Sequence, residues 1–402
     1  GPALESAYKI CKNSAAMNDV ASKALLPAGL QDLLPPDAAR EAELGASLLA
    51  SFRAHGYERV KPPFIEFEDS LLSGTGAGLA ESSFRLMDPV SRRMMALRSD
   101  MTPQVARIAR TRLARAPRPL RLSYGGDILR VQGSELRPER QFAQVGFELI
   151  CAASPHADAE VVLLAVEALS ELGLKNLTVD LSAPTLVTTI IDGLDLDGEA
   201  RAALRGALDR KDVAGVASLG AAAAGQLHDL LGATGAAGPA LAALSKLDLP
   251  ENACAAAASL CDVAQLILEA SPGLGMTIDP VERRGFEYQI GVSFTLFAGG
   301  VRGELGRGGR YPLVDNGSPI EDATGCTLYM DSLLRAAPRG AAERRIFLPH
   351  GTARRIAGKL RAEGWIAIAA LEPAGDDMAE ARRLGCSHLY ARSGPAAVQP
   401  EE

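Results

Sequence analysis

The chain has 402 residues, of which 47% are hydrophobic and 23% charged, and its formal net charge is −7. This composition is typical of a soluble globular protein long enough for two or three domains. The acidic balance argues against a protein that holds nucleic acid mainly by charge, so we expect no nucleic-acid partner.

The distribution of cysteine, histidine and apolar residues narrows the class further. The six cysteines and five histidines are scattered without metal-ligand spacing, so we expect no metal site. No stretch reaches 18 continuous apolar residues, so we expect no membrane segment. Unpaired cysteines favour a cytoplasmic protein.

The N-terminal part begins with residues 1–24, which do not resemble the rest of the chain and are expected to be an expression remnant or a flexible N-terminus. A helix is predicted from Asp37, after two prolines, to a stop at Gly56. The next segment, 57–66, contains two prolines, which belong at a sheet edge or an interface.

Three local patterns come next in the chain. Residues 73–78 are glycine-rich but lack the Lys-Ser/Thr of a phosphate loop, so a mobile loop is predicted. Residues 84–87 and 94–98 predict a hairpin. Thr102 is a good N-cap for a helix whose first residue is Pro103.

A central hairpin is predicted from the alternating segments 124–132 and 140–148, which a turn-rich loop connects. One face of the second segment is apolar: Ala143, Val145, Phe147 and Leu149. The other face carries Arg140, Phe142, Gln144, Gly146 and Glu148. The second face has the groups that a small zwitterionic ligand requires, but a solvated polar face fits the same pattern.

The remaining chain alternates between helix and strand signals. A helix over 154–172 precedes a strand over 176–181, and an Ala-rich helical insertion is expected over about 193–270. Strands are then predicted over 292–297 and up to Leu305.

The glycine-rich run 306–311 is not expected to bind nucleotide, because no helix pattern comes after it. A strand over 323–328 leads into a helix over 330–335, and a linker over 338–343 precedes a small β-α-β-α-β unit over 344–394.

These segments, in this order, resemble a class II aminoacyl-tRNA synthetase, and specifically the histidyl enzyme. The match covers about Leu26 to Leu334 of a domain expected over 25–337, and it is weaker in the helical insertion. Residues 37–66 are similar to motif 1 and the central hairpin to motif 2. Arg284-Gly-Phe-Glu-Tyr288 is similar to a histidyl-specific element, and Gly306–Tyr311 to the family's Gly-Gly-Arg-Tyr. The resemblance implies an α+β fold with an antiparallel sheet flanked by helices, and a homodimer formed through the motif 1-like segment.

Two departures from the family pattern affect the ATP site. The glutamate of motif 2 is Gln132 here, and the arginine of motif 3 that clamps the γ-phosphate is Ser332. Loss of such a guanidinium costs on the order of 10² to 10³ in rate, and serine cannot replace it. We therefore expect no catalytic residue and no cofactor.

The amino-acid pocket of the family is largely kept. The positions that match its histidine contacts are Asp100, Thr102, Arg130, Gln144, Glu148, Arg284 and Tyr288. Asp100 is shorter than the family's glutamate, and Gln289 replaces a tyrosine. The resemblance therefore implies a histidine pocket beside a defective ATP site.

That combination is similar to the regulatory subunits of the short-form ATP phosphoribosyltransferase. The resemblance implies a separate catalytic subunit as partner, histidine as effector, and a role in the first step of histidine biosynthesis. The effector site is expected in the synthetase-like pocket or at the subunit interface. An active histidyl-tRNA synthetase with a shortened tail and a tRNA-binding scaffold are the alternatives.

Overall fold

The computed structural model of the chain describes residues 25–133, 137–194, 196–218, 221–282, 289–315, 318–340, 343–391 and 394–399. The chain divides into two compact units, unit 1 up to Pro338 and unit 2 from Arg339 onward. The N-terminal segment 1–24 that the sequence sets apart lies outside the described residues.

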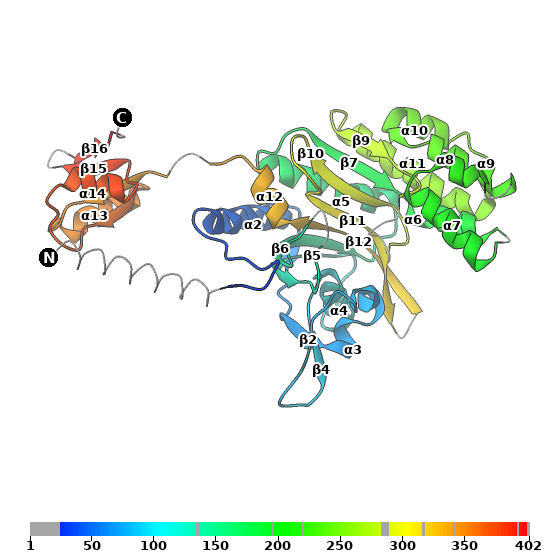
Figure 1. Cartoon of the computed structure of the whole chain (residues 1–402), viewed down its shortest axis with the longest axis horizontal. Coiled ribbons are helices and arrows are strands. Elements are labelled where there is room, and N and C mark those ends of the chain that lie inside the picture. Colours follow the sequence, from blue (N-terminus) through cyan, green and yellow to red (C-terminus); the bar gives the residue numbers. More distant parts are fainter. Residues whose placement is uncertain are drawn as a thin grey trace, which may run out of the picture. The chain divides into compact units, whose positions relative to one another are not determined.

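A nine-stranded sheet forms the centre of unit 1, in the order β1-β5-β6-β12-β11-β10-β7-β9-β8 (Figure 1). The strands are β1 Glu58–Arg59, β5 Leu120–Leu129, β6 Gln141–Ile150, β7 Leu177–Ser182, β8 Gly235–Ala236, β9 Gly275–Ile278, β10 Ser293–Ala298, β11 Gly306–Asp315 and β12 Ser318–Tyr329. All neighbours except β1–β5 and β7–β9 are antiparallel. The predicted α+β class with an antiparallel sheet is confirmed.

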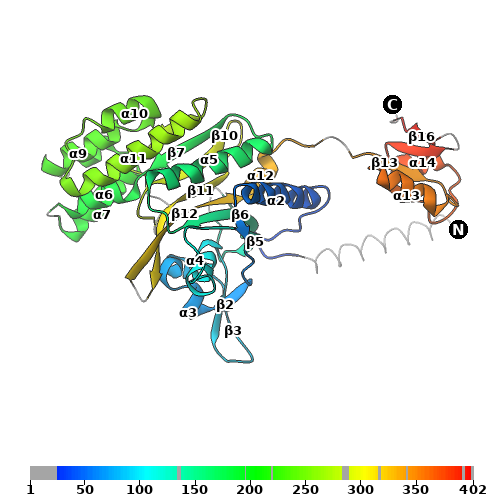
Figure 2. The same cartoon turned by 180° about the vertical axis from the view of Figure 1, so that it is seen from behind.

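The predicted central hairpin is β5 and β6, and its two faces are divided as the alternation predicts. Val145 and Phe147 on β6 face a large core with α2 Asp37–Ala54 and α5 Pro155–Glu171. Phe142 faces a second, smaller core that includes residues of α4 Thr102–Thr111. The helices α2 and α5 thus cover one face of the sheet and α4 the other, as Figures 1 and 2 show from opposite sides.

The elements near the N-terminus agree with the prediction apart from two corrections. Helix α2 and the hairpin of β3 Arg85–Met87 with β4 Met94–Leu97 form as expected, and β2 Ile65–Phe67 pairs with β4. The glycine-rich segment is not an irregular loop but a short 3-10 helix, Gly74–Leu79, packed against α4 and β11.

The second correction concerns the start of α4. The N-cap is Met101 and not Thr102, because the chain becomes helical one residue earlier than predicted. The Asp100 side chain accepts a hydrogen bond from the Thr102 amide at 3.3 Å, so a carboxylate satisfies one of the free amides of the first turn.

The predicted insertion consists mainly of helices: α6 Pro184–Asp192 precedes α7 Gly198–Asp209, α8 Val213–Ser218, α9 Ala221–Gly232, α10 Ala237–Leu244 and α11 Glu251–Ala270. Within α11, the stretch Ala253–Ala270 is long and apolar enough to cross a membrane. Its fully buried Leu260 and Val263 join the main core, and α11 packs against α5 and α6. One side of α11 is therefore packed into the core.

A strand predicted up to Leu305 is wrong, because residues before Gly306 form a loop and the glycine-rich run itself is the start of β11. Glycines at 306 and 308 leave room for the neighbouring backbone of β12. Strand β12 then leads directly into α12 Met330–Ala336, as expected.

Unit 2 has a four-stranded sheet in the order β14-β13-β15-β16. Its elements are β13 Arg345–Leu348, α13 Arg354–Ala362, β14 Ile366–Ala369, α14 Asp377–Arg383, β15 His388–Ala391 and β16 Gly394–Ala397. Strand β13 is parallel to both of its neighbours, whereas β16 is antiparallel and was not predicted. Trp365 is buried beneath α13 and closes one side of its core.

Candidate functional site

A polar pocket lies on the α4 side of the large sheet, where β6, β12 and β11 run side by side. Its cavity volume, counted as the space open to the centre of a water-sized sphere, is about 40 Å³. The lining residues come from five segments: Asp100, Thr102, Gln144, Glu148, Gln289, Arg307, Gly308, Gly309, Tyr311, Gly325, Thr327 and Tyr329. Most of these side chains are polar, so the pocket suits a small polar ligand.

Glu148 is the best-anchored group of the pocket and is 1% exposed. Tyr124 donates to its Oε1 at 3.1 Å, and Tyr311 donates to its Oε2 at 2.9 Å. The Tyr124 hydroxyl also shares hydrogen bonds with Thr102 (3.2 Å) and Thr327 (2.8 Å). Two tyrosines from different strands therefore hold the carboxyl group in one orientation.

Burial raises the pKa of Glu148 to about 8, against the hydrogen bonds from Tyr311 and Tyr124, which lower it. The pKa of Asp100 is also raised by burial, although the charge of Arg130 opposes the shift. A nearby positive charge would stabilise both carboxylates. One buried and one half-buried acid of raised pKa in one pocket are the arrangement expected of a site that accepts a cationic group.

Two further groups face the pocket with different chemistry. The side chain of Gln289 is 7% exposed, and its carbonyl oxygen has no hydrogen-bond partner among the described residues. Buried acceptors rarely remain unpaired, so this oxygen is suited to a donor on a ligand. Arg307 provides positive charge on the pocket wall, paired with Glu304.

Four of the predicted site residues are brought together here: Asp100, Thr102, Gln144 and Glu148 line the pocket. Gln144 accepts a hydrogen bond from the Met101 amide at 3.3 Å, which ties β6 to the start of α4.

The other three predicted residues have different outcomes. Arg130 lies beside the pocket, where its Nε donates to the Ser99 carbonyl at 3.4 Å. Arg284 and Tyr288 lie outside the described residues.

Sequence reasoning missed several residues that line or support the pocket. Tyr311 and Arg307 belong to the glycine-rich run, which was matched to the family but given no role in binding. Thr327 and Tyr329 are on β12, where side chains of one face recur every second residue. That period could have identified them once Gly325 was placed opposite Glu148.

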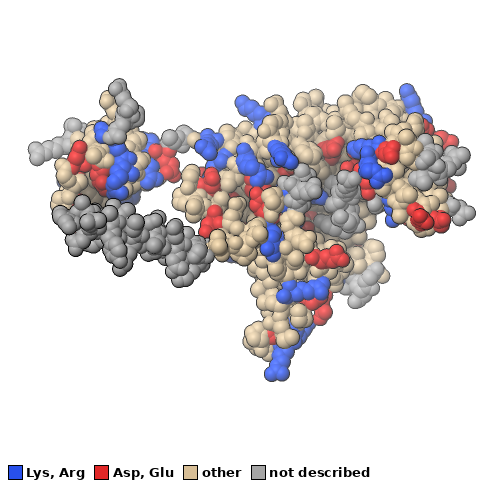
Figure 3. Space-filling model, in the orientation of Figure 1, with Lys and Arg blue, Asp and Glu red and all other residues tan. Residues whose placement is uncertain are grey.

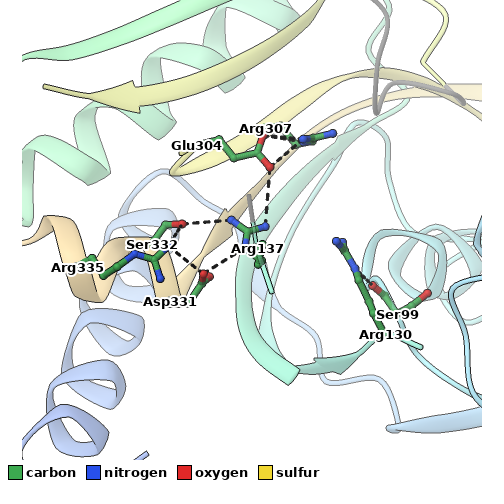
Figure 4. Close-up of polar contacts among 8 residues, drawn as sticks. All are labelled: Ser99, Arg130, Arg137, Glu304, Arg307, Asp331, Ser332 and Arg335. Carbon is green, nitrogen blue, oxygen red and sulfur yellow. Dashed lines mark hydrogen bonds and ion pairs between the residues drawn. The ribbon is translucent and has the colours of Figure 1, made fainter. Parts of the chain in front are cut away.

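The positions predicted to have lost ATP contacts are not alike. Gln132 is exposed just after β5. Ser332 is buried, and its hydroxyl accepts hydrogen bonds from Arg137 and Arg335, each at 3.2 Å (Figure 4). Guanidinium groups therefore do occupy this region, but Asp331 pairs with both of them, at 3.2 Å.

Within the described part of the chain, no group of three or more His, Cys, Asp or Glu side chains is placed to hold a metal ion. On the face presented in Figure 3, basic and acidic side chains are interspersed among the described residues.

Comparisons with known proteins give the family. A sequence model of the histidyl-tRNA synthetase family matches residues 29–333. The ATP phosphoribosyltransferase regulatory subunit of Rhodospirillum centenum is 56% identical over 370 residues, which cover 92% of this chain and 95% of that protein. That of Paramagnetospirillum magneticum is 52% identical over 383 residues, which cover 95% of this chain and 100% of that protein.

Solved structures agree on the fold. A structure described as an ATP phosphoribosyltransferase regulatory subunit/histidyl-tRNA synthetase from Bacillus halodurans C has a TM-score of 0.77 at 24% identity, covering 90% of this chain and 96% of that one. A histidine–tRNA ligase subunit from Alicyclobacillus acidocaldarius has a TM-score of 0.63 at 27% identity, covering 78% of this chain and 97% of that one. The prediction of a regulatory and non-catalytic subunit is confirmed by the curated relatives, and this chain belongs to the family of ATP phosphoribosyltransferase regulatory subunits, which has the histidyl-tRNA synthetase fold.

Proposed function

We propose that this chain binds free histidine in the pocket around Glu148 and, together with a short-form catalytic subunit, makes the first step of histidine biosynthesis sensitive to its end product. The observation that carries the proposal is the pair of acids with raised pKa, the buried Glu148 and the half-buried Asp100, in a pocket that also contains Arg307. An α-amino acid has complementary groups, an ammonium for the acids and a carboxylate for the arginine.

The side chain of histidine adds N–H donors to this match. The unpaired carbonyl oxygen of Gln289 and the hydroxyl of Thr327 are two pocket groups that can pair with a polar ring. The pocket therefore supports a polar amino acid better than an aliphatic one, whose side chain would leave Gln289 without a partner.

The proposed mechanism is a population shift between two states of the assembly. Histidine inhibits only if it binds one state more tightly than the other, and the catalytic subunit must have lower activity in that state. Removal of the pocket acids is then expected to relieve inhibition without removing activation by this subunit.

A homodimer is part of the proposal, formed through the motif 1-like segment. Strand β1 lies at the open edge of the nine-stranded sheet, with Glu58 and Arg59 exposed. A groove beside it is lined by Leu49, Ala50, Arg53, Gly56, Tyr57, Glu58, Arg59 and Ser123. An unpaired edge next to an apolar groove is suited to a second subunit. Light scattering on the isolated chain tests this, and a monomer at micromolar concentration would contradict it.

Calorimetry with histidine tests the site directly. Wild type is expected to bind histidine without its partner, and Glu148→Ala is expected to lose at least about tenfold in affinity, because a charge-assisted hydrogen bond contributes roughly 1.5–3 kcal/mol. If neither isolated protein binds histidine while the complex does, the site lies at the interface with the catalytic subunit.

The regulatory role itself is tested by mixing. A short catalytic subunit is expected to gain activity when this chain is added and to lose it when histidine is then supplied. Histidine-dependent exchange of pyrophosphate into ATP by this chain alone would support the active synthetase instead. Tight tRNA binding with a steep salt dependence would support the scaffold. The cytoplasm is the proposed location of the assembly.

A further inference from the structure

Five side chains of alternating charge form a chain of ion pairs from the pocket wall to helix α12, which we call the charge ladder: Arg307, Glu304, Arg137, Asp331 and Arg335. Arg307 pairs with Glu304 at 2.7 Å, and Glu304 lies 3.8 Å from the next guanidinium, that of Arg137. Arg137 and Arg335 then share Asp331, each at 3.2 Å (Figure 4).

Arg137 is the central residue of the ladder, and acidic, aromatic and hydroxyl side chains contact its guanidinium. It is 8% exposed, although it lies in a turn-rich connection. Its guanidinium lies 3.8 Å from the ring centre of Tyr329 and 4.8 Å from that of Phe142, and it donates to Ser332. Because Tyr329 lines the pocket, Arg137 lies directly behind one pocket wall.

The charge balance of the ladder decides what else can bind there. Each carboxylate lies between two guanidiniums: Glu304 between Arg307 and Arg137, and Asp331 between Arg137 and Arg335. Arg137 faces both of these acids, which are tethered to the fold, so they compete with a diffusing anion for its guanidinium at high effective concentration. They also repel a phosphate group in a partly buried site, where charges are poorly screened.

We propose that Arg137 is a specificity-determining residue, which fills the space beyond Tyr329 and restricts the pocket to a free amino acid. A ligand extended at its carboxylate by a nucleoside phosphate would have to displace a buried guanidinium that is already paired with two acids. The statement that the pocket accepts a free amino acid rests on the proposed function. The statement that it excludes a nucleotide depends only on the charge ladder.

The test measures binding of three probes to the full chain by calorimetry: histidine, ATP, and histidyl-sulfamoyl-adenosine, a stable analogue of the adenylate. Wild type is expected to bind the analogue at least about tenfold more weakly than histidine and to show no binding of ATP. Arg137→Ala is expected to gain about tenfold or more for the analogue while its affinity for histidine changes by less than about threefold.

Arg335→Ala is the matched control. Arg335 contacts the same Asp331 and Ser332, but its side chain is 48% exposed at the outer end of the ladder. Its removal is expected to leave both affinities unchanged. If a thermal melt shows that Arg137→Ala does not fold, Asp331→Asn replaces it in the test. This variant keeps the side-chain shape but removes the charge that pairs with Arg137, so a smaller gain in affinity for the analogue is expected.

Three outcomes would overturn the inference. Wild type could bind the analogue as tightly as histidine. Wild type could also bind ATP tightly while Arg137→Ala does not, which would mean that Arg137 binds phosphate. Arg137→Ala could also fold and gain nothing for the analogue. Failure of wild type to bind histidine would instead reject the proposed function, whereas ATP binding by wild type that is lost in Arg137→Ala would still contradict the role given to Arg137.

Discussion

Tyr311 on β11 donates a hydrogen bond to Glu148 on β6 at 2.9 Å, although strand β12 lies between them. The contact is possible because the β12 residue opposite Glu148 is Gly325. A Cβ at that position would lie 1.6 Å from Glu148 Oε2, the oxygen that Tyr311 contacts. The hydrogen bond between Tyr311 and Glu148 therefore requires a glycine at position 325.

Gly325→Ala is expected to disrupt the pocket, because the added methyl group overlaps the Glu148 carboxyl group and one of the two must move. We expect a loss of stability of about 1–3 kcal/mol in urea unfolding, and loss of histidine binding. Gly225→Ala is the control, since nothing lies within 4 Å of its Cβ. It replaces a glycine within helix α9, so its stability should rise by up to about 1 kcal/mol. Unchanged histidine affinity in Gly325→Ala would contradict the geometry.

Histidine binding is expected to release protons at pH 7. In the free protein Glu148 is mostly protonated at this pH, because burial raises its pKa to about 8. An ammonium group beside it favours the carboxylate and lowers this pKa, so up to about one proton leaves per site. Calorimetry in two buffers of different ionisation enthalpy measures the release. Glu148→Gln, which cannot ionise, should release correspondingly less, and equal release by both proteins would exclude Glu148 as the partner.

The stability of the free protein should depend on Glu148 in a defined direction. Its folded-state pKa of about 8 lies above the ordinary 4.5, so the folded state holds a proton that the unfolded chain has lost between these values. This contribution is fully present below pH 4.5 and is lost as pH rises through 8. Glu148→Gln should therefore be more stable than wild type at pH 8.5, by on the order of a few kcal/mol, and similar to it near pH 4.5. Urea midpoints across this range measure the difference, and a more stable wild type at pH 8.5 would reverse the sign.

Arg310 is expected to be structurally essential, because it neutralises a buried acid at the start of α5. Asp158 is 2% exposed, accepts from Arg310 at 2.8 and 3.2 Å, and accepts from Thr324 at 2.6 Å. Arg310→Ala leaves this carboxylate buried without its cation, which typically costs about 3–5 kcal/mol.

Denaturant unfolding measures that cost. Arg205→Ala is the control, because Arg205 pairs with Asp192 at 3.7 Å and both side chains are at least 36% exposed. A surface pair of this kind contributes at most about 1 kcal/mol. Similar losses in the two variants would mean that Asp158 does not depend on Arg310.

The local patterns of the sequence were sufficient for the elements and the family. The two faces of the β6 segment result from strict alternation, and the helix predicted over 154–172 forms as α5 within one residue at each end. The prediction for Thr102 was wrong by one residue, because a sequence pattern fixes the end of a helix only to within one or two residues. Four pocket residues were identified because the two segments that contain them, the start of α4 and strand β6, each match a local motif.

The rest of the site depends on which strands, distant in the sequence, become neighbours in the sheet. The alternation of residues along one strand does not show which other strand pairs with it. Tyr311 and Glu148 are 163 residues apart, and Arg137 and Ser332 are 195 apart. From the sequence, Ser332 indicated a site without a guanidinium. The fold places Arg137 there and pairs it with acids from two other segments, because the order β6-β12-β11 is set by packing of the whole sheet. The sequence alone therefore determined most of the secondary structure and the family, because both depend on local patterns, whereas the tertiary structure decided which charges meet.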